Sequence, residues 1–344
     1  MNENCANAAS SSLTEALCAA GAVFDSGMIS CFGDPDKDLA AANEQTVVSP
    51  LLHLGMIRVS GEDARSFLHS QFTSDINHLG ADVVQHSAWC SAKGRMIASF
   101  IVWRDGDAYL LALSRDLVEP IAKRLQMFVL RAKVSIAIAG DSTSMIGVSG
   151  KHLGDTLGKA ALPLPETMRS APFPGGSVVR LDSARVIVSV ASDHAADAWK
   201  QLASVATPVG TPAWNWLDIQ QGLPMISAAT REHFVPQMAN FERIGGVSFH
   251  KGCYPGQEIV ARTQYLGKVK RHLFRVRADV PLAAGNELFS PAAPDQSCGM
   301  VVTASGTAVR GYSGLAVLME AAVEAGVHLS ALDGPILAAD PVAT

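Results

Sequence analysis

Residues 249–262 read Phe-His-Lys-Gly-Cys-Tyr-Pro-Gly-Gln-Glu-Ile-Val-Ala-Arg, and this stretch carries more reactive chemistry than any other part of the chain. Cys253 stands between Gly252 and Gly256, where the backbone can turn sharply and approach a ligand closely. Pro255 suits the first turn of a helix, because the N–H that proline lacks has no intrahelical partner there. We therefore expect a helix to begin near Gly256, with Cys253 just before its N-terminus.

This position favours the thiolate form of Cys253. The N-terminal end of a helix carries partial positive charge, and Lys251 and Arg262 add cations if they fold inward. The thiolate is the reactive form of cysteine, both as a nucleophile and as a metal ligand. His250 lies three residues earlier and has a spacing that a metal pair can use, but a solvated histidine is the simpler interpretation. Cys253 is therefore the candidate reactive residue, and no self-contained metal site is predicted.

The segment Lys251-Gly252-Cys253-Tyr254-x-Gly256-Gln257-Glu258 resembles the signature K-G-C-Y-x-G-Q-E of the YgfZ family. These are folate-binding proteins related to the glycine-cleavage T-protein, an aminomethyltransferase. Segments 216–224 and 234–240 are also similar to family segments, and the resemblance covers roughly residues 47–320. The candidate site residues that accompany Cys253 are Lys251, Tyr254, Gln257, Glu258 and the nearby Arg262.

Composition limits the class of protein. A chain of 344 residues is long enough for two or three domains, and 48% hydrophobic with 17% charged residues allows a packed core. Lys and Arg total 27 against 32 Asp and Glu, so the net charge of −5 supplies no general basic field for nucleic acid. A direct RNA-binding modifier is therefore the weakest of the functional hypotheses.

The cysteines indicate neither a disulfide framework nor a self-contained metal centre. Six are scattered along the chain, and no C-x-x-C pair is present, so a zinc ribbon or an iron–sulfur site is not encoded. The N-terminus lacks the basic segment of a secretory signal, and no apolar run reaches membrane-spanning length. We expect a cytoplasmic monomer that contacts no membrane.

Patterning predicts an α+β fold of several units. Residues 1–44 are rich in Ala, Ser and Asn and are expected to form a loosely attached, flexible extension. Strand 56–59, the hairpin 96–113 around Asp105-Gly106, and helix 117–128 fall in a unit made of 45–132 and 209–262, which carries the signature. Residues 133–208 form a second, ferredoxin-like α+β unit. Alternating polarity over 274–280 starts a small β-barrel in 263–344. The resemblance implies the same order, with two α+β domains and a C-terminal barrel around a central channel.

The resemblance also implies that a folate, as tetrahydrofolate, occupies that channel. Trp214 stands where the family has a tryptophan that faces the pterin, and an indole ring can stack a flat heterocycle. Leu54 replaces a second family tryptophan, and Gln220 replaces a glutamate that accepts hydrogen bonds from the aminopyrimidine edge. The basic residues Lys268, Lys270, Arg271, Arg275 and Arg277 are either a solvated strand face or an anion contact at the channel mouth.

Two functions follow from the resemblance. Ala98 and Ser99 stand where the T-protein has an acidic pair, and neither can stabilise an iminium as a carboxylate does, which argues against aminomethyl transfer and against an enzyme. The favoured hypothesis is an accessory protein that assembles or repairs iron–sulfur clusters, with Cys253 as its centre. Its expected partners are cluster-assembly factors and iron–sulfur enzymes such as those that thiolate tRNA. The alternative is a folate-dependent one-carbon transferase with displaced catalytic groups.

Overall fold

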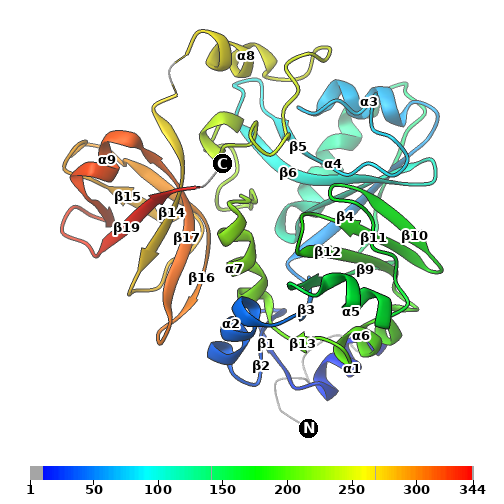
Figure 1. Ribbon diagram of the computed structural model, residues 1–344. Helices are drawn as coiled ribbons and strands as arrows, with labels where there is room; N and C mark the ends of the chain where they lie inside the picture. Colours follow the sequence, from blue (N-terminus) through cyan, green and yellow to red (C-terminus); the bar gives the residue numbers. More distant parts are fainter. Residues whose placement is uncertain (1–10, 141, 268, 343–344) are drawn as a thin grey trace.

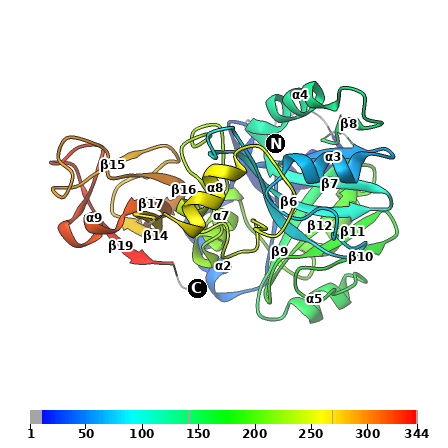
Figure 2. The same cartoon turned by 90° about the horizontal axis from the view of Figure 1, so that it is seen from above.

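Two large β-sheets, a two-stranded sheet and a β-barrel lie around the helix α7 (Thr211–Gln221), which contacts strands of both the barrel and the N-terminal half (Figure 1). The structure is a computed structural model, and it describes residues 11–140, 142–267 and 269–342. Seen from above, the barrel lies on one side of α7 and the two sheets lie on the other (Figure 2). Pro212 suits the first turn of α7, and Gly222 ends the helix in the left-handed conformation at φ +67°.

The first sheet has five antiparallel strands in the order β5-β6-β7-β4-β8. The hairpin predicted over 96–113 is confirmed, and Gly106 takes φ +59° in its turn. The elements of this unit are β4 (Leu54–Ser60), α3 (Ala64–Gln71), β5 (Gln85–Cys90), β6 (Met96–Asp105), β7 (Ala108–Ser114), the 3-10 turn η2 (Arg115–Leu117), α4 (Val118–Val129) and β8 (Ser135–Ile138).

The second sheet has six strands in the order β10-β11-β12-β9-β3-β13, of which only the β13–β3 pair is parallel. Its elements are β3 (Val47–Pro50), β9 (Thr143–Ser149), α5 (Leu153–Lys159), β10 (Ser170–Phe173), β11 (Gly176–Arg180), β12 (Arg185–Ala191), α6 (Ala195–Ala203) and β13 (Thr207–Pro208).

The two sheets exchange strands across the boundaries expected from the sequence. β3 belongs by position to the first unit but pairs with β9 of the second, and β8 belongs to the second but pairs with β4 of the first. The expected boundaries near residues 45 and 133 therefore do not separate the sheets. Period-two patterning identifies a strand and its buried face, but it does not identify the partner strand.

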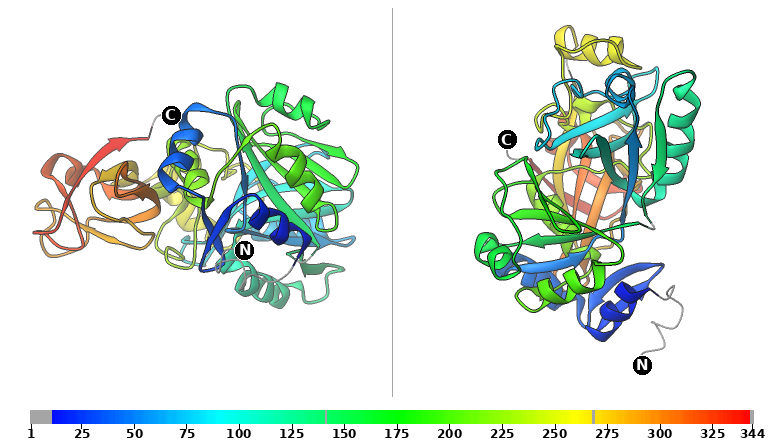
Figure 3. Two further views of the ribbon diagram at one scale, coloured as in Figure 1. Left: turned by 90° about the horizontal axis from the view of Figure 1, so that it is seen from below. Right: turned by 90° about the vertical axis from the view of Figure 1, so that its right-hand side faces the viewer.

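Residues 11–44 correct the expectation of a loosely attached extension. They form α1 (Ser12–Ala19), β1 (Ala22–Asp25), β2 (Met28–Phe32) and α2 (Pro35–Glu44), whereas residues 1–10 lie outside the described residues. Leu17 and Ile29 are buried in the core of the six-stranded sheet, and the Asp38 carboxylate accepts hydrogen bonds from the N–H groups of Phe32 and Gly210. Figure 3 shows this segment, in dark blue, against the rest of the molecule. Short elements rich in alanine gave too weak a pattern to predict this packing.

The C-terminal part closes into a barrel in the order β14-β17-β16-β15-β18-β19, which confirms the predicted small barrel. The alternation expected over 274–280 is present in β14, where Phe274, Val276 and Ala278 are buried. The elements are β14 (Arg271–Ala278), β15 (Glu287–Phe289), β16 (Gly299–Thr307), β17 (Gly311–Met319), α9 (Glu320–Ala325), β18 (Val327–Leu329) and β19 (Ile336–Pro341). Between α7 and the barrel, the 3-10 turn η3 (Pro236–Ala239) and α8 (Gln257–Tyr265) flank the signature loop.

Candidate functional site

The loop that carries Cys253 is pressed against the turn between β5 and β6. Gly256 has φ +78°, and a Cβ atom there would lie 2.3 Å from the carbonyl oxygen of Ser91. A Cβ atom on Gly94 would lie 2.9 Å from the side chain of Ile259 in α8. Only glycine fits both positions, so the two glycines allow the close contact that fixes the loop. The Cys253 side chain itself is exposed.

Lys251 anchors this loop to the end of α3. It is 8% exposed, and its ammonium group donates hydrogen bonds to the carbonyl oxygens of His69 and Phe72. Carbonyl groups at the C-terminus of a helix are favourable partners for a cation. Nζ also lies 5.0 Å from the centre of the Tyr254 ring. Burial lowers the pKa of Lys251 to about 8, and Asp75 opposes that effect.

The other signature residues flank Cys253 without surrounding it. Tyr254 is buried, and burial, followed by nearby Cys90, raises the pKa of its hydroxyl. Gln257 begins α8 and its N–H donates to the Tyr254 carbonyl at 3.2 Å, whereas Glu258 is exposed. Arg262 corrects an expectation, because its exposed side chain lies in the last turn of α8 rather than folding inward. α8 begins at Gln257 with Gly256 as its N-cap, which confirms the helix expected to start near Gly256 with Cys253 just before it.

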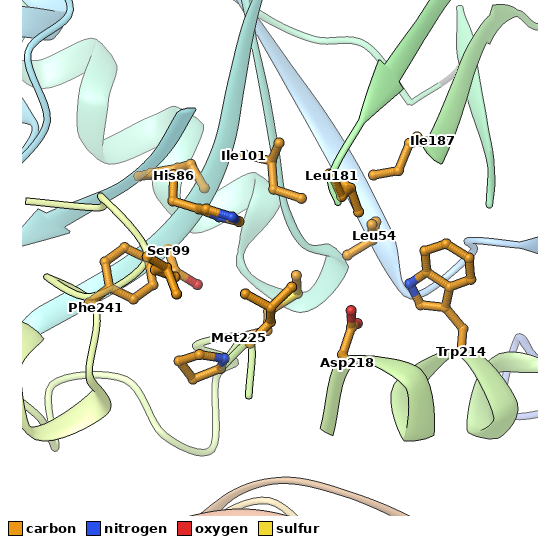
Figure 4. Close-up of a pocket in the computed structure, with 14 residues that line it drawn as sticks. Leu54, His86, Ser99, Ile101, Leu181, Ile187, Trp214, Asp218, Met225 and Phe241 are labelled. Carbon is orange, nitrogen blue, oxygen red and sulfur yellow. The ribbon is translucent and has the colours of Figure 1, made fainter. Parts of the chain in front are cut away.

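A small cavity lies between the two sheets and α7 (Figure 4). Trp214 and Leu54, both predicted as ligand-contacting residues, line it together. Gln220 does not, since it lines a separate hollow with Trp216 and Gln221. Gln220 follows Asp218 by two positions in α7. Residues at that spacing do not share a helix face, so Gln220 does not line the cavity with Asp218. The cavity is lined by Leu54, His86, Ser99, Phe100, Ile101, Leu181, Ile187, Trp214, Asp218, Leu223, Pro224, Met225, Phe241 and Ile244.

The sequence analysis did not identify the polar residues that line this cavity, Asp218 and His86, as candidate site residues. Asp218 follows Trp214 by four residues, which places both on one face of α7, and this spacing was the available signal. Its Oδ1 atom lies 2.5 Å from Nη1 of Arg185, and Asp182 Oδ2 lies 2.8 Å from Nε of the same arginine. The Arg185 guanidinium lies 5.8 Å from the centre of the Trp214 ring. Trp214 packs so closely on Gly147 that a Cβ there would lie 2.3 Å from its Cζ3 atom.

His86 adds an imidazole to the cavity wall. Burial lowers its pKa to about 4, and the charge of Arg185 adds to this effect. The ring is therefore neutral at pH 7 and offers one donor and one acceptor. Among the described residues no hydrogen bond engages either ring nitrogen, although the ring meets Phe241 edge to face at 6.4 Å. His86 is thus free to bind a polar group that enters the cavity.

The cavity has a volume of about 30 Å³, enough for a water molecule but not for a bicyclic ring. Met225 is one of the apolar side chains that line the cavity (Figure 4). Leu54 also lines a neighbouring cavity of about 410 Å³, so its side chain is part of the wall between the two. Methionine changes its conformation readily, which makes Met225 the side chain most able to enlarge the cavity.

Ala98 and Ser99, the positions of the acidic pair in the T-protein, have different surroundings. Ser99 lines the cavity and its Oγ accepts a hydrogen bond from the Ile226 N–H at 2.9 Å. Ala98 is fully buried in the core of the five-stranded sheet. Neither residue brings a carboxylate to the cavity, where Asp218 is the acid and is paired with Arg185.

Comparison with known proteins identifies the family. The chain is 34% identical over 236 residues to the tRNA-modifying protein YgfZ of Colwellia psychrerythraea, which is 67% of this chain and 71% of that protein. The chain belongs to the YgfZ family. The YgfZ protein of Vibrio vulnificus is 30% identical over 240 residues, 70% of this chain and 72% of its own, and that of Escherichia coli is 28% identical over 246 residues, 71% of this chain and 75% of its own. No family model matches the chain.

The fold of this YgfZ-family chain is similar to that of a solved aminomethyltransferase. The glycine cleavage system aminomethyltransferase T from Bartonella henselae superposes with a TM-score of 0.80 and 17% identity, over 96% of each chain. The predicted fold, α+β units followed by a C-terminal β-barrel, is therefore confirmed. Within the described residues, no three His, Cys, Asp or Glu side chains are placed to hold a metal ion, and no helix is both long and apolar enough to cross a membrane.

Proposed function

We propose that this chain is a folate-binding accessory protein for the assembly or repair of iron–sulfur clusters in enzymes, including enzymes that act in tRNA modification. The observation that carries the proposal is the placement of Cys253. Of the cysteines free in the structure, Cys31, Cys90 and Cys298 are buried, and Cys253 alone is exposed. It sits on a loop that Gly256 packs against the Ser91 carbonyl and that Lys251 anchors by hydrogen bonds. The relatives that carry the name tRNA-modifying protein support the link to tRNA modification.

An exposed thiol on a fixed loop suits contact with a cluster held by another protein. The thiolate is a soft ligand of the kind that binds iron in clusters, and it is also the form that exchanges with disulfides. The cluster is cargo in this proposal, because the described residues of the chain do not encode a site to retain it. Cys253 then acts either as a transient ligand or as a redox thiol.

The cavity beside Trp214 suits the ring of a reduced folate in its chemistry. Trp214 can stack the ring, Asp218 offers an acceptor oxygen, and His86 and the Ser99 hydroxyl offer further polar contacts. A bound folate would supply a carrier for one-carbon units at its ring nitrogens. The ring fits only if the cavity enlarges, for which Met225 is the most adaptable lining side chain, and Leu54, in place of a tryptophan, gives a smaller apolar surface.

The same cavity argues against aminomethyl transfer. A carboxylate beside the folate is needed to stabilise a developing cation, and Ser99 cannot carry that charge. Asp218 is the nearest acid, but Arg185 already neutralises it at 2.5 Å. Folate binding without transfer is therefore the function that these residues favour.

The test is complementation of a bacterium that lacks its own YgfZ. The wild-type chain is expected to restore the level of thiolated tRNA, whereas Cys253→Ser is expected to fail because a serine hydroxyl neither ionises near neutral pH nor binds iron as a thiolate does. Cys31→Ser, which removes a buried thiol away from the signature, is the matched control and should restore function. Full restoration by Cys253→Ser would refute the proposal.

A further inference from the structure

The helix α8 lies at the edge of the molecule and leaves one of its faces uncovered (Figure 1). Its attachment to the rest of the fold rests on Val260, which is fully buried and whose carbonyl accepts a hydrogen bond from the Gln237 side chain at 2.8 Å. Successive residues of a helix are about 100° apart, so the half of α8 opposite Val260 can be read from the sequence. That half carries five exposed side chains, which we call the α8 face: Glu258, Ile259, Arg262, Tyr265 and, at the C-cap, Leu266.

Three of the five side chains in the α8 face are large and hydrophobic. Ile259 is 39% exposed, Tyr265 is 64% exposed and Leu266 is 85% exposed. Exposed hydrophobic side chains that gather on one surface and are rimmed by charged residues mark a site of interaction with another macromolecule. Tyrosine and arginine are also enriched where proteins bind each other. The α8 face therefore has the composition of a protein interface.

The α8 face is close to the exposed thiol. Cys253 precedes Gln257, the first residue of α8, by four positions, so their Cα atoms lie at most about 14 Å apart. At the other end of α8, the Tyr265 ring meets the Phe249 ring edge to face, with the ring centres 6.0 Å apart, and Phe249 begins the signature stretch. A protein interface of ordinary size covers about 800 Å² of each partner, a patch roughly 30 Å across. A partner that sits on the α8 face is therefore within reach of Cys253.

The charge on and beside the α8 face is positive, although the chain as a whole has a net charge of −5. Its exposed cations are Arg262 in α8 and Lys93 and Arg95 in the turn between β5 and β6, which packs against α8 at Gly94. Among the described residues none of the three cations forms an ion pair, and Arg95 donates to backbone carbonyls, which leave its charge in place. Glu258 is the acid of the α8 face. Three cations against one acid favour an anionic partner.

We infer that the α8 face docks the protein that holds the iron–sulfur cluster and that it binds the acidic surface around that cluster. This inference rests on the proposed function of Cys253. A cluster ligated by four thiolates is an anion, because the thiolates outweigh the positive charge of the iron–sulfide core. The hydrophobic side chains favour a folded protein over a nucleic acid, whose interfaces are more polar. A second copy of this chain suits the surface less, since a two-fold contact would bring Arg262 against the same set of cations.

The experiment measures, by biolayer interferometry, the binding of the full chain to a purified iron–sulfur enzyme that thiolates tRNA in the complementation host, with its cluster in place. Leu266→Asp is expected to weaken binding about tenfold, because it replaces a hydrophobic contact with a charge that the acidic partner repels. Arg262→Glu should also weaken binding and should reduce its dependence on salt. Leu130→Asp is the matched control, since Leu130 at the end of α4 is 88% exposed, close to the value for Leu266, and this variant should bind as wild type does.

The exposure of Leu266 means that Leu266→Asp should fold normally, and its Cys253 thiol should react with iodoacetamide at the wild-type rate. Wild-type binding by both Leu266→Asp and Arg262→Glu, or no binding by the wild-type chain, would overturn the inference. It would also be overturned if these variants lost binding to tRNA but not to the enzyme, or if their only defect were a loss of self-association in sedimentation. These last two results would assign the α8 face to a nucleic acid or to a second copy of the chain.

Docking and the proposed function can fail separately. Cys253→Ser should still bind the enzyme although it fails in complementation, because docking depends on the α8 face and not on the thiol. Leu266→Asp should lose both binding and complementation while its thiol stays reactive. If Cys253→Ser restored thiolated tRNA while Leu266→Asp still lost binding, the proposed role of the thiol would be wrong and the docking surface would stand.

Discussion

Arg185 and Asp218 form a buried ion pair in which Nη1 and Oδ1 lie 2.5 Å apart, and this pair joins β12 to α7 beside Trp214. Arg185 is 1% exposed and Asp218 is 17% exposed at its side chain. The pair fixes the face of α7 that bears Trp214, and it places a carboxylate in the cavity. Asp218 therefore belongs both to the ion pair and to the lining of the cavity.

Asp218→Asn should destabilise the chain by about 3 kcal/mol, because it leaves the Arg185 charge buried with one partner fewer. Burial raises the pKa of Asp218 and Arg185 opposes that effect, so loss of the arginine charge would favour a protonated acid. Urea unfolding at pH 7 measures the difference. Asp182→Asn is the matched control, since that side chain is more exposed and should cost less. An equal loss in the free energy of unfolding for the two variants would contradict the conclusion that Asp218 is the more important partner of Arg185.

Met225→Ala should strengthen the binding of tetrahydrofolate, because it empties the space that a ring must enter. Trp214→Ala should weaken binding by about 1–3 kcal/mol, by analogy with the loss of stacking between a base and an aromatic side chain. Isothermal titration of each variant against wild type gives both values. Ile219→Ala alters α7 away from the cavity lining and controls for indirect effects. If Met225→Ala weakened binding as much as Trp214→Ala, the methionine would be a ligand contact rather than an obstacle.

The chain should lose stability in acid between pH 6.5 and 4, and His86 should contribute to this loss. Its folded pKa is about 4 against an ordinary value of 6.5, so the unfolded chain binds a proton that the folded chain does not. The stability that the neutral His86 contributes is therefore fully present above pH 6.5. It is lost as the pH falls towards 4, and the loss in the free energy of unfolding is at most about 3 kcal/mol. His53 is lowered to about 4 in the same way and adds a second such group.

His86→Gln isolates the share of His86. The free energy of unfolding of this variant, measured in urea at pH 7, 6 and 5, should fall less steeply with decreasing pH than that of wild type. A difference of about 1.4 kcal/mol per pH unit is the limit for one proton. Parallel curves for the two proteins would show that the imidazole titrates normally and that the cavity is open to water.

The signature loop, the hairpin and the barrel were predictable because each has a local pattern. Cys253 and its glycines form a continuous motif, and β14 alternates buried and exposed residues. The cavity was predicted only in part. Trp214 and Leu54 were found through the resemblance, but Arg185 and His86 reach α7 from strands far away in the sequence, so no spacing connects them. Gln220 was misplaced because similarity of position does not give the face of a helix.

Residues 11–44 were predicted wrongly in the other direction. Their composition resembles that of a linker, yet they pack into the core of the six-stranded sheet. Leu17→Ala in α1 should therefore cost about 2–4 kcal/mol, the usual range for emptying a fully buried leucine site. Urea unfolding gives this value, with Glu15→Ala on the same helix as control. A change below about 0.5 kcal/mol, as is typical of a surface position, would mean that α1 is not part of the folded core in solution.

The most direct test of the account asks whether folate binds without being used. The wild-type chain is titrated with tetrahydrofolate and, in parallel, is incubated with tetrahydrofolate and an aminomethyl donor while methylenetetrahydrofolate is followed. We predict saturable binding, with quenching of tryptophan fluorescence that Trp214→Ala reduces, and no product above the uncatalysed rate. Formation of methylenetetrahydrofolate at an enzymatic rate, with Ser99 and Ala98 in place of acids, would contradict the account and favour a transferase.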